Sequence, residues 1–175
     1  MQRIQIVGRG GSGKTTLAKK LSEKLNIQHY EPDAYFWLPN WQEKDTLQFQ
    51  NEIERILTED KWVLCGAYFN RLNGAICRQA DTIIWLNFPP RVFLPRLIKR
   101  AMKRIFIREK IWGTNYESFW HFWFNPKRSI LWINAVHYYK NGRNAYRNQV
   151  EKHDQQDKLI EFKHPKELEK WLQNM

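Results

Sequence analysis

Residues 8–15 read GRGGSGKT and fit the pattern G-x-x-x-x-G-K-[ST], which is typical of loops that bind the phosphates of a nucleotide. The preceding stretch 3–7, RIQIV, is a short β-branched run and predicts a strand. The following stretch 14–26 predicts a helix, because leucines recur in it at helical spacing: Leu17, Leu21 and Leu25. The motif requires strand, loop and helix in this order, so a glycine turn without a ligand is the weaker interpretation.

The residue types of this loop explain how it would hold phosphate. Glycines let successive backbone N–H groups turn inward, and the positive end of the following helix adds to their attraction for an anion. The predicted phosphate-binding residues are Gly8, Gly10, Gly11, Ser12, Gly13, Lys14, Thr15 and Thr16. We expect Lys14 to reach the β- and γ-phosphates of ATP, and the Thr15 hydroxyl to join the oxygen shell of Mg²⁺.

The composition of the 175-residue chain indicates a single domain, residues 1–175. Its 29 Lys and Arg residues outnumber its 18 Asp and Glu residues, and the formal net charge of +11 favours an anionic partner, either a nucleotide or a nucleic acid. The N-terminal residues lack the apolar run of a secretory signal, and no apolar run is long enough to span a membrane. Cys65 and Cys77 lack metal-site spacing. We therefore expect a reduced, cytoplasmic protein without a membrane partner.

Short apolar runs after the first helix predict four further strands, in the stretches 26–30, 61–66, 80–87 and 158–162. The stretch 31–42 is predicted to be a loop, and the helix after it begins at a capping box of Asp45 and Gln48. The expected apolar face of that helix consists of Leu47, Ile53, Ile56 and Leu57. A last helix is predicted over 165–173. Strands that alternate with helices indicate a mainly parallel sheet covered on both faces, with ligands at the carboxyl ends of the strands.

A basic segment, residues 91–110, follows the fourth strand and contains eight Lys or Arg residues against the single acid Glu109. Its arginines recur every four positions, at Arg96, Arg100, Arg104 and Arg108, and form one stripe if the segment is helical. Like charges at this spacing destabilise a helix unless an anion lies against them, so the stripe favours an anion site over a merely solvated basic face. Pro95 would kink a helix that begins as early as Pro90.

An aromatic segment, residues 111–139, comes next. The helix expected to begin near Pro126 is apolar nearly all round, which indicates burial within the fold or against a second subunit, as in a homodimer. Stacking of one or two of its rings on a nucleobase is the alternative.

The chain resembles the adenylate-kinase-like P-loop kinases, and among them the group named DNA topology modulation proteins (FlaR-like). The resemblance rests on the phosphate loop, on HYEPDAYFWLPNWQ (29–42), WVLCGAYFNRL (62–72) and RQADTIIWLNFPPR (78–91), and on the basic and aromatic segments. It implies an α/β fold of three layers, the P-loop NTPase fold. A five-stranded parallel sheet of order 2-3-1-4-5 would carry helices on both faces and a basic helical lid at about 91–145. It also implies transfer of the γ-phosphoryl group of ATP to a small acceptor.

The resemblance also implies roles for single residues. Asp33 matches a carboxylate that faces the acceptor, where it would orient the attacking oxygen, take its proton or hold Mg²⁺ through water; the alternative for an Asp beside a proline is a turn. The residues expected to bind the acceptor are Asp33, Arg71, Arg78 and Arg143. In the lid, Arg100 and Arg104 are expected to act in catalysis, with Arg100 also bound to ATP, because the rigid arginine fork holds phosphoryl oxygens.

The chain departs from this group at Cys65, where similar enzymes usually carry an aspartate that binds the hydration shell of the metal. A thiol is a poor ligand for Mg²⁺. Either Asp33 carries the metal shell together with Thr15, which we favour, or metal binding is weakened. Cys65 is otherwise interpreted as a small buried core residue.

Two functions follow from these patterns. The first is a small-molecule kinase that uses ATP and Mg²⁺, with a nucleotide or nucleoside-like acceptor. The alternative is a nucleic-acid-binding ATPase that affects DNA topology, supported by the net charge and by the basic residues interleaved with aromatics. We favour the kinase because the basic cluster falls in the segment where a kinase needs it for ATP phosphates.

Overall fold

A computed structural model describes residues 1–120 and 144–175. Its main sheet contains the strands β1 (Arg3–Gly8), β2 (His29–Tyr30), β5 (Trp62–Cys65), β6 (Thr82–Leu86) and β7 (Leu159–Phe162). They lie in the order β2-β5-β1-β6-β7, and every neighbouring pair is parallel. This confirms the five predicted strands and their predicted order.

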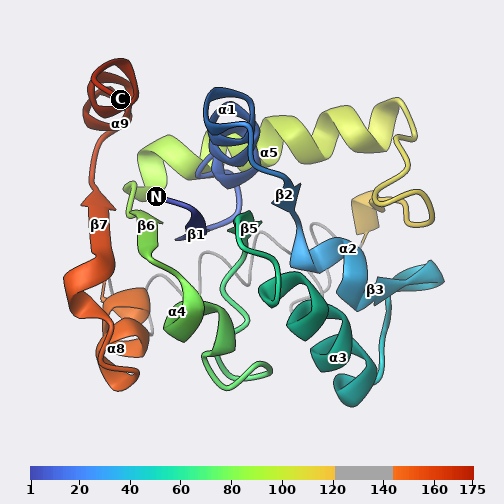
Figure 1. The fold of residues 1–175 in the computed structure, drawn as a ribbon. Coiled ribbons are helices and arrows are strands. Elements are labelled where there is room, and N and C mark those ends of the chain that lie inside the picture. The colour runs from blue at the N-terminus through green and yellow to red at the C-terminus, as the bar shows by residue number, and fades with distance from the viewer. Residues whose placement is uncertain (121–143) are drawn as a thin grey trace.

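Helices cover both faces of the sheet (Figure 1). One face carries α1 (Lys14–Leu25) and α9 (Pro165–Gln173), and the other carries α3 (Thr46–Leu57), α4 (Ala75–Gln79) and α8 (Ala145–Lys152). Strand side chains alternate between these layers: Ile4 and Ile6 pack with the α1 side, while Val7 packs with the α3 side. Because both faces are covered, the strands are apolar along nearly their whole length, as in other doubly covered parallel sheets.

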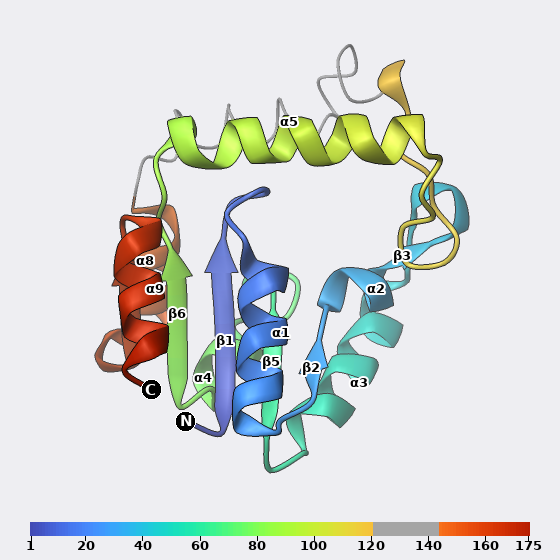
Figure 2. The same cartoon turned by 90° about the horizontal axis from the view of Figure 1, so that it is seen from above.

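The helix α5 (Pro90–Phe106) crosses the carboxyl ends of the strands, above the loop that follows β1 (Figure 2). It begins at Pro90, where a proline suits the first helical turn, and continues through Pro95. The basic segment is therefore helical as far as Phe106, and the helix begins at the earlier of the positions considered. Arg108 of the predicted stripe lies beyond the end of the helix, with a left-handed φ of 48°. The buried side chains of α5 are Phe93, Leu97 and Ala101.

The contact between α5 and the phosphate loop is close. A Cβ atom placed on Gly11 would lie 2.4 Å from the carbonyl oxygen of Phe93 and 2.9 Å from the backbone nitrogen of Leu97. Gly11 also has a left-handed φ of +79°. Only glycine meets both conditions without strain, so this residue lets the helix rest on the loop.

Some local predictions were wrong. The stretch 31–42 is not a plain loop, since it contains α2 (Pro32–Phe36), β3 (Trp37–Leu38) and the 3-10 turn η1 (Pro39–Trp41), and then begins β4 (Gln42–Glu43). Leu47 is 68% exposed, and Phe49 takes the buried place expected for it. The reason is the helical period, which puts position 49, and not 47, on the face of Ile53 and Ile56.

The predicted starts of two helices are confirmed. Asp45 is the N-cap of α3, as expected, and its carboxylate accepts from the backbone N–H groups of Leu47 and Gln48. The predicted last helix is α9, which begins at Pro165 behind a capping box of His164 and Glu167. The short 3-10 turn η2 (Gln156–Lys158) precedes β7.

Two predictions concern residues that the structure does not describe. The aromatic helix near Pro126, with the homodimer inferred from it, lies outside the described residues, and so does Arg143. Within 1–120 and 144–175, no helix has the length and apolar character needed to cross a bilayer.

Replacing Gly11 by alanine should destabilise the protein more than replacing Gly13. Both glycines have left-handed backbone, but no described atom lies within 4 Å of a Cβ built on Gly13. We expect Gly13→Ala to lower the free energy of unfolding by about 1 kcal/mol, from strain alone. Gly11→Ala adds the clash with α5 and should lower it by about 3 kcal/mol. Urea denaturation measures both; equal losses would show that α5 does not rest on the loop.

Candidate active site

The phosphate loop joins β1 to α1 at the carboxyl edge of the sheet. Gly8, Gly11 and Gly13 have positive φ angles of 153°, 79° and 96°, and the Ser12 N–H donates to the carbonyl oxygen of Arg9 (3.1 Å). No side chain in the described part of the chain caps the start of α1 at Gly13. The first-turn N–H groups and the helix dipole there are thus available to an anion.

The side chains of the loop fit a phosphate ligand. The Lys14 Nζ donates to the carbonyl oxygen of Arg9 (3.1 Å), which folds its ammonium group back over the loop. The Ser12 hydroxyl is buried and has no hydrogen-bond partner among the described residues. A buried hydroxyl without a partner costs free energy, which a ligand oxygen would recover.

A cleft of about 420 Å³ opens between the loop, α5 and α9. Its polar wall consists of Gly11, Ser12, Gly13, Lys14, Thr15, Thr16, Lys20, Arg96, Arg100 and Glu169. Its apolar wall consists of Leu17, Phe88, Pro165, Leu168 and Leu172. The combination of a phosphate-binding polar end and an apolar end suits a nucleotide.

Asp33 lies in the first turn of α2, directly after β2, and its carboxylate accepts a hydrogen bond of 2.5 Å from the Tyr68 hydroxyl. Burial raises the pKa of the Asp33 carboxyl, and the Tyr68 hydrogen bond and the positive charges of Lys14 and Arg100 only partly offset this. The charges of Lys14 and Arg100 both act on the Asp33 carboxyl, so the two cations lie within electrostatic range of it.

Cys65 ends β5 beside this group. It is a buried free cysteine, as interpreted from the sequence, and its Sγ lies 3.8 Å from the Thr15 Oγ1. Burial raises the pKa of the thiol to about 11, so at neutral pH it is uncharged and a poor partner for Mg²⁺.

The oxygen donors around Cys65 do fit magnesium. The described residues contain no group of three or more His, Cys, Asp and Glu side chains that could hold a metal ion. Mg²⁺ needs none, since it typically binds through one or two carboxylates, substrate phosphates and waters. The Thr15 hydroxyl and the Asp33 carboxylate supply a suitable protein contribution.

Arg100 and Arg104 of α5 interact with carboxylates from the segment after this helix. Loss of hydration and the like charge of Arg104 lower the pKa of Arg100, whereas the negative charge of Glu117 opposes the shift. Burial raises the pKa of Glu117, and Arg104 and Arg100 partly offset it. Arg104 also lies 4.0 Å from Glu109. The sequence showed the arginines but did not identify Glu117, because its partners are a helix away.

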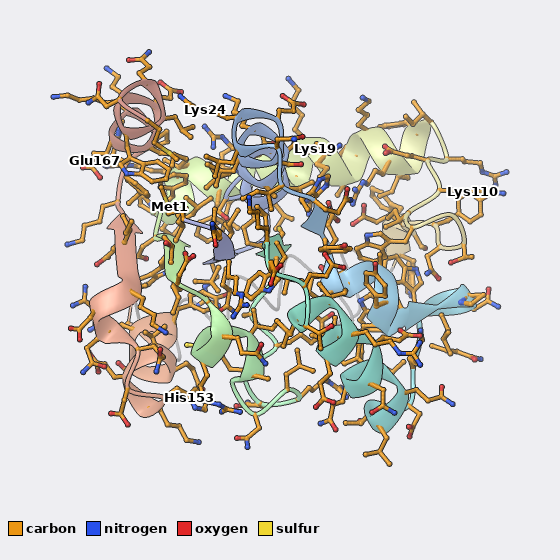
Figure 3. All side chains as sticks on the ribbon, in the orientation of Figure 1. Met1, Lys19, Lys24, Lys110, His153 and Glu167 are labelled. Carbon is orange, nitrogen blue, oxygen red and sulfur yellow. The ribbon has the colours of Figure 1, made fainter. Side chains whose placement is uncertain are left out.

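The arginines predicted to bind the acceptor are separated. Arg71 donates to the Glu43 carboxylate (2.7 Å), and its guanidinium lies 4.6 Å from the centroid of the Phe36 ring in α2. The contacts of Arg78 connect it instead with the α8 side, where its charge helps to lower the pKa of His153 after burial, the larger cause. Figure 3 shows His153 at that end of the molecule.

Comparisons with known proteins find several relatives of this chain. The NB-ARC domain model matches residues 1–67. The uncharacterized protein YqaC of Bacillus subtilis is 30% identical over 119 residues, covering 67% of this chain and 66% of that protein. A shikimate kinase of Azobacteroides pseudotrichonymphae is 28% identical (63% and 74% covered), and a cytidylate kinase of Pyrococcus horikoshii is 31% identical (55% and 56% covered). The matched region thus spans just under two thirds of the length of YqaC.

Solved structures show the same architecture. The shikimate kinase from Bacteroides thetaiotaomicron superposes with a TM-score of 0.58 at 17% identity, covering 99% of this chain and 95% of that one. The shikimate kinase from Acinetobacter baumannii in complex with shikimate gives 0.55 at 16% identity, with 99% and 94% covered. The chain therefore shares the α/β fold of these structures, with a five-stranded parallel sheet between layers of helices. At this level of identity the likeness concerns the fold alone, and the FlaR-like group stays a prediction.

Two tyrosines support the site and were not predicted from the sequence. Tyr68 follows β5 and holds the Asp33 carboxylate. Tyr146, from α8, donates to the carbonyl oxygen of Gly8 (3.2 Å), and the Arg9 guanidinium lies 5.6 Å from the centroid of its ring. Both contacts join segments that are far apart in sequence, so no local pattern indicated them.

Replacing Asp33 by asparagine should raise stability while it removes a charge from the site. Because the folded-state pKa of Asp33 is raised, its contribution to stability is present in acid and is lost as the pH rises through that pKa. The asparagine side chain stays neutral at every pH and keeps an oxygen for the Tyr68 hydroxyl. We expect the Tm of Asp33→Asn to exceed that of the wild type at neutral pH, with the difference vanishing in acid.

Asp81 provides a control, because its pKa is shifted in the opposite direction from that of Asp33. Burial opposes its ionisation, but hydrogen bonds from the backbone of Arg3 and Gln2 and from the Thr82 hydroxyl lower its pKa overall. Its contribution is therefore present at neutral pH and lost as the pH falls, so Asp81→Asn should lower the Tm at neutral pH. A lower Tm for Asp33→Asn at neutral pH would contradict the assignment of Asp33 as a strained, functional carboxylate.

Proposed function

We propose that this protein is a kinase that transfers the γ-phosphoryl group of Mg-ATP to a hydroxyl of a small acceptor, nucleotide or nucleoside-like. The observation that carries the proposal is the buried Asp33 carboxylate, which lies within electrostatic range of Lys14 and Arg100, two residues that line the nucleotide cleft. A phosphate-binding loop with a carboxylate opposite is the arrangement that in-line phosphoryl transfer to a hydroxyl needs.

The residues divide the work of this reaction. The loop N–H groups and Lys14 hold the ATP phosphates, while Asp33 orients the acceptor hydroxyl and takes its proton. The hydroxyl oxygen bonds to the γ-phosphorus as the bond to the bridging oxygen of ADP breaks, and ADP leaves with that electron pair. Magnesium, held through Thr15 and, by way of water, Asp33, would neutralise phosphate charge. Arg100, and Arg104 behind it, would stabilise charge on the transferred group.

Burial of Asp33 suits the role of a base. A raised pKa brings a carboxylate closer to the acidity at which it can accept a proton near neutral pH. The Tyr68 hydroxyl holds one oxygen of the Asp33 carboxylate and thereby fixes the orientation of the other oxygen. The relatives named shikimate kinase and cytidylate kinase support a small-molecule acceptor.

The alternative, a nucleic-acid-binding ATPase, is less well supported by the location of the charge. Arg96 and Arg100 of α5 are exposed residues that line the nucleotide cleft beside Lys14. The positive charge of α5 beside the phosphate loop therefore favours the binding of ATP phosphates over the binding of nucleic acid.

The Lys14→Ala variant should lose at least about a hundredfold of its ATP turnover, because it removes the charge held over the loop. Asp33→Asn should lose acceptor-dependent turnover while it keeps most of its ATP affinity. Lys19→Ala, which changes an exposed lysine of α1 (Figure 3), is the matched control and should retain activity. The measurement is acceptor-stimulated ADP release; retained transfer by Asp33→Asn would remove its assigned role.

Binding of nucleic acid is tested by its dependence on salt. If DNA is a partner, the logarithm of the affinity should fall by about one unit per decade of salt for each phosphate neutralised. For a kinase of small acceptors we expect weak DNA binding that leaves ADP release unchanged. Stimulation of ATP hydrolysis by DNA alone, with phosphate released to water, would overturn the kinase proposal.

A further inference from the structure

Tyr146, in the first turn of α8, contacts the phosphate loop from the face of the sheet that also carries α3 and α4 (Figure 1). Its hydroxyl donates a hydrogen bond of 3.2 Å to the carbonyl oxygen of Gly8, the first residue of the loop. Gly8 is buried, and a buried carbonyl oxygen without a donor costs free energy. The two residues are 138 positions apart, so this hydrogen bond ties the loop to a distant element of the fold.

The ring of Tyr146 is held by its neighbours. It packs edge-on against Trp85 of β6, with ring centroids 6.0 Å apart, and is tilted against Phe69 at 6.4 Å. The Arg9 guanidinium lies 5.6 Å from the centroid of the same ring, in an attractive cation–π contact. The first two residues of the loop therefore both contact Tyr146, Gly8 through its carbonyl oxygen and Arg9 through its side chain.

The helix α8 is itself anchored to the sheet. Val150 is fully buried, and Arg147 forms an ion pair with the Glu161 carboxylate of β7. Glu161 also accepts from the side chain of Asn87 (2.7 Å), the residue after β6. The Tyr146 hydroxyl is thus carried by an element that is fixed to two strands, which is how a donor is kept in one position.

A loop rich in glycine needs support of this kind. Three of its glycines have positive φ angles, and glycine loses more conformational entropy on ordering than any other residue. Within the loop, the Arg9 carbonyl oxygen accepts from the Ser12 N–H and from the Lys14 Nζ, each at 3.1 Å. If Lys14 turns to the ATP phosphates, as proposed above, one of these contacts is lost. The Tyr146 hydrogen bond does not involve Lys14 and stays in place.

We propose that Tyr146 is a positioning residue for the phosphate loop, which holds the Gly8 carbonyl from α8 and keeps the loop in the conformation that binds the phosphates of ATP. The inference rests on the phosphate-binding role proposed above for the loop. Because a peptide group is planar and trans, a fixed Gly8 carbonyl also fixes the direction of the Arg9 N–H. A loop ordered in advance binds more tightly, since less conformational entropy is lost when the ligand arrives.

This role has a kinetic signature. The cost of ordering a loosened loop is paid when ATP binds, and it is then the same in the bound state and in the transition state. Loss of the Tyr146 hydroxyl should therefore raise KM for ATP and leave kcat nearly unchanged. A residue that only stabilised the fold would lower Tm without changing KM at temperatures where the protein stays folded.

The test is the Tyr146→Phe variant, which removes the hydroxyl and keeps the ring. Calorimetric titrations with Mg-ATP and with inorganic tripolyphosphate measure Kd without any transfer reaction. We expect both Kd values to rise about tenfold, as for the loss of one buried hydrogen bond. In the ADP-release assay, KM for ATP should rise by about the same factor, and kcat should stay within about twofold.

Two variants serve as controls, with Tm and circular dichroism measured for each. Tyr30→Phe removes a hydroxyl that donates to Glu59 (2.7 Å) at the end of β2, and it should leave both Kd values unchanged. Val150→Ala loosens α8 but keeps the Tyr146 hydroxyl, and it should lower Tm with a smaller effect on Kd. An equal loss of affinity in Val150→Ala would show that the stability of α8, and not the hydroxyl, matters, and would overturn the inference.

The remaining outcomes separate this inference from the kinase proposal. Unchanged Kd values in Tyr146→Phe, or a fall in kcat at unchanged KM, would overturn the positioning role and leave the kinase proposal standing. Failure of Tyr146→Phe to fold would assign Tyr146 to folding and would overturn the positioning role too. A wild-type protein that bound neither Mg-ATP nor tripolyphosphate would overturn both proposals.

Discussion

The contact between α5 and the glycine loop is the constraint on which the rest of the site depends. The helix backbone approaches Gly11 so closely that any Cβ there would clash with Phe93. This approach carries Arg96 and Arg100 to the rim of the phosphate loop. It also sends the chain after α5 across the carboxyl edge of the sheet, where it meets the segment after β2 (Figure 2). Gly11 therefore allows α5, which follows β6, to form one wall of the site at the end of β1.

The arrangement of the charged residues in the site lowers the stability of the folded protein. Burial raises the pKa of Asp33 by more than Tyr68, Lys14 and Arg100 lower it, and desolvation together with the like charge of Arg104 lowers the pKa of Arg100. Such arrangements persist at functional sites because the surrounding packing holds them in place. Two well-packed layers, with Trp62 and Trp85 fully buried on one side of the sheet, supply that support.

Much of the fold was predictable because its signals are local. The glycine pattern, the β-branched runs and the capping residues Asp45 and Pro165 each report on the conformation of their own neighbours. The short elements between 31 and 43 were not predicted because α2 and the β3 hairpin are stabilised by contacts with distant residues. The Trp41 N–H, for example, depends on Asn115, and the Trp41 indole depends on Tyr116.

The sequence by itself determined that the chain forms a parallel sheet with a phosphate loop at its carboxyl edge, since strand period, glycine spacing and helix caps are read within a few residues. Only the tertiary structure decided which side chains share the site. Tyr68 reaches Asp33 across 35 positions, and Tyr146 reaches Gly8 across 138. Such pairings depend on how whole elements pack, and a hydrogen bond acts only over about 3 Å, so no sequence spacing encodes them.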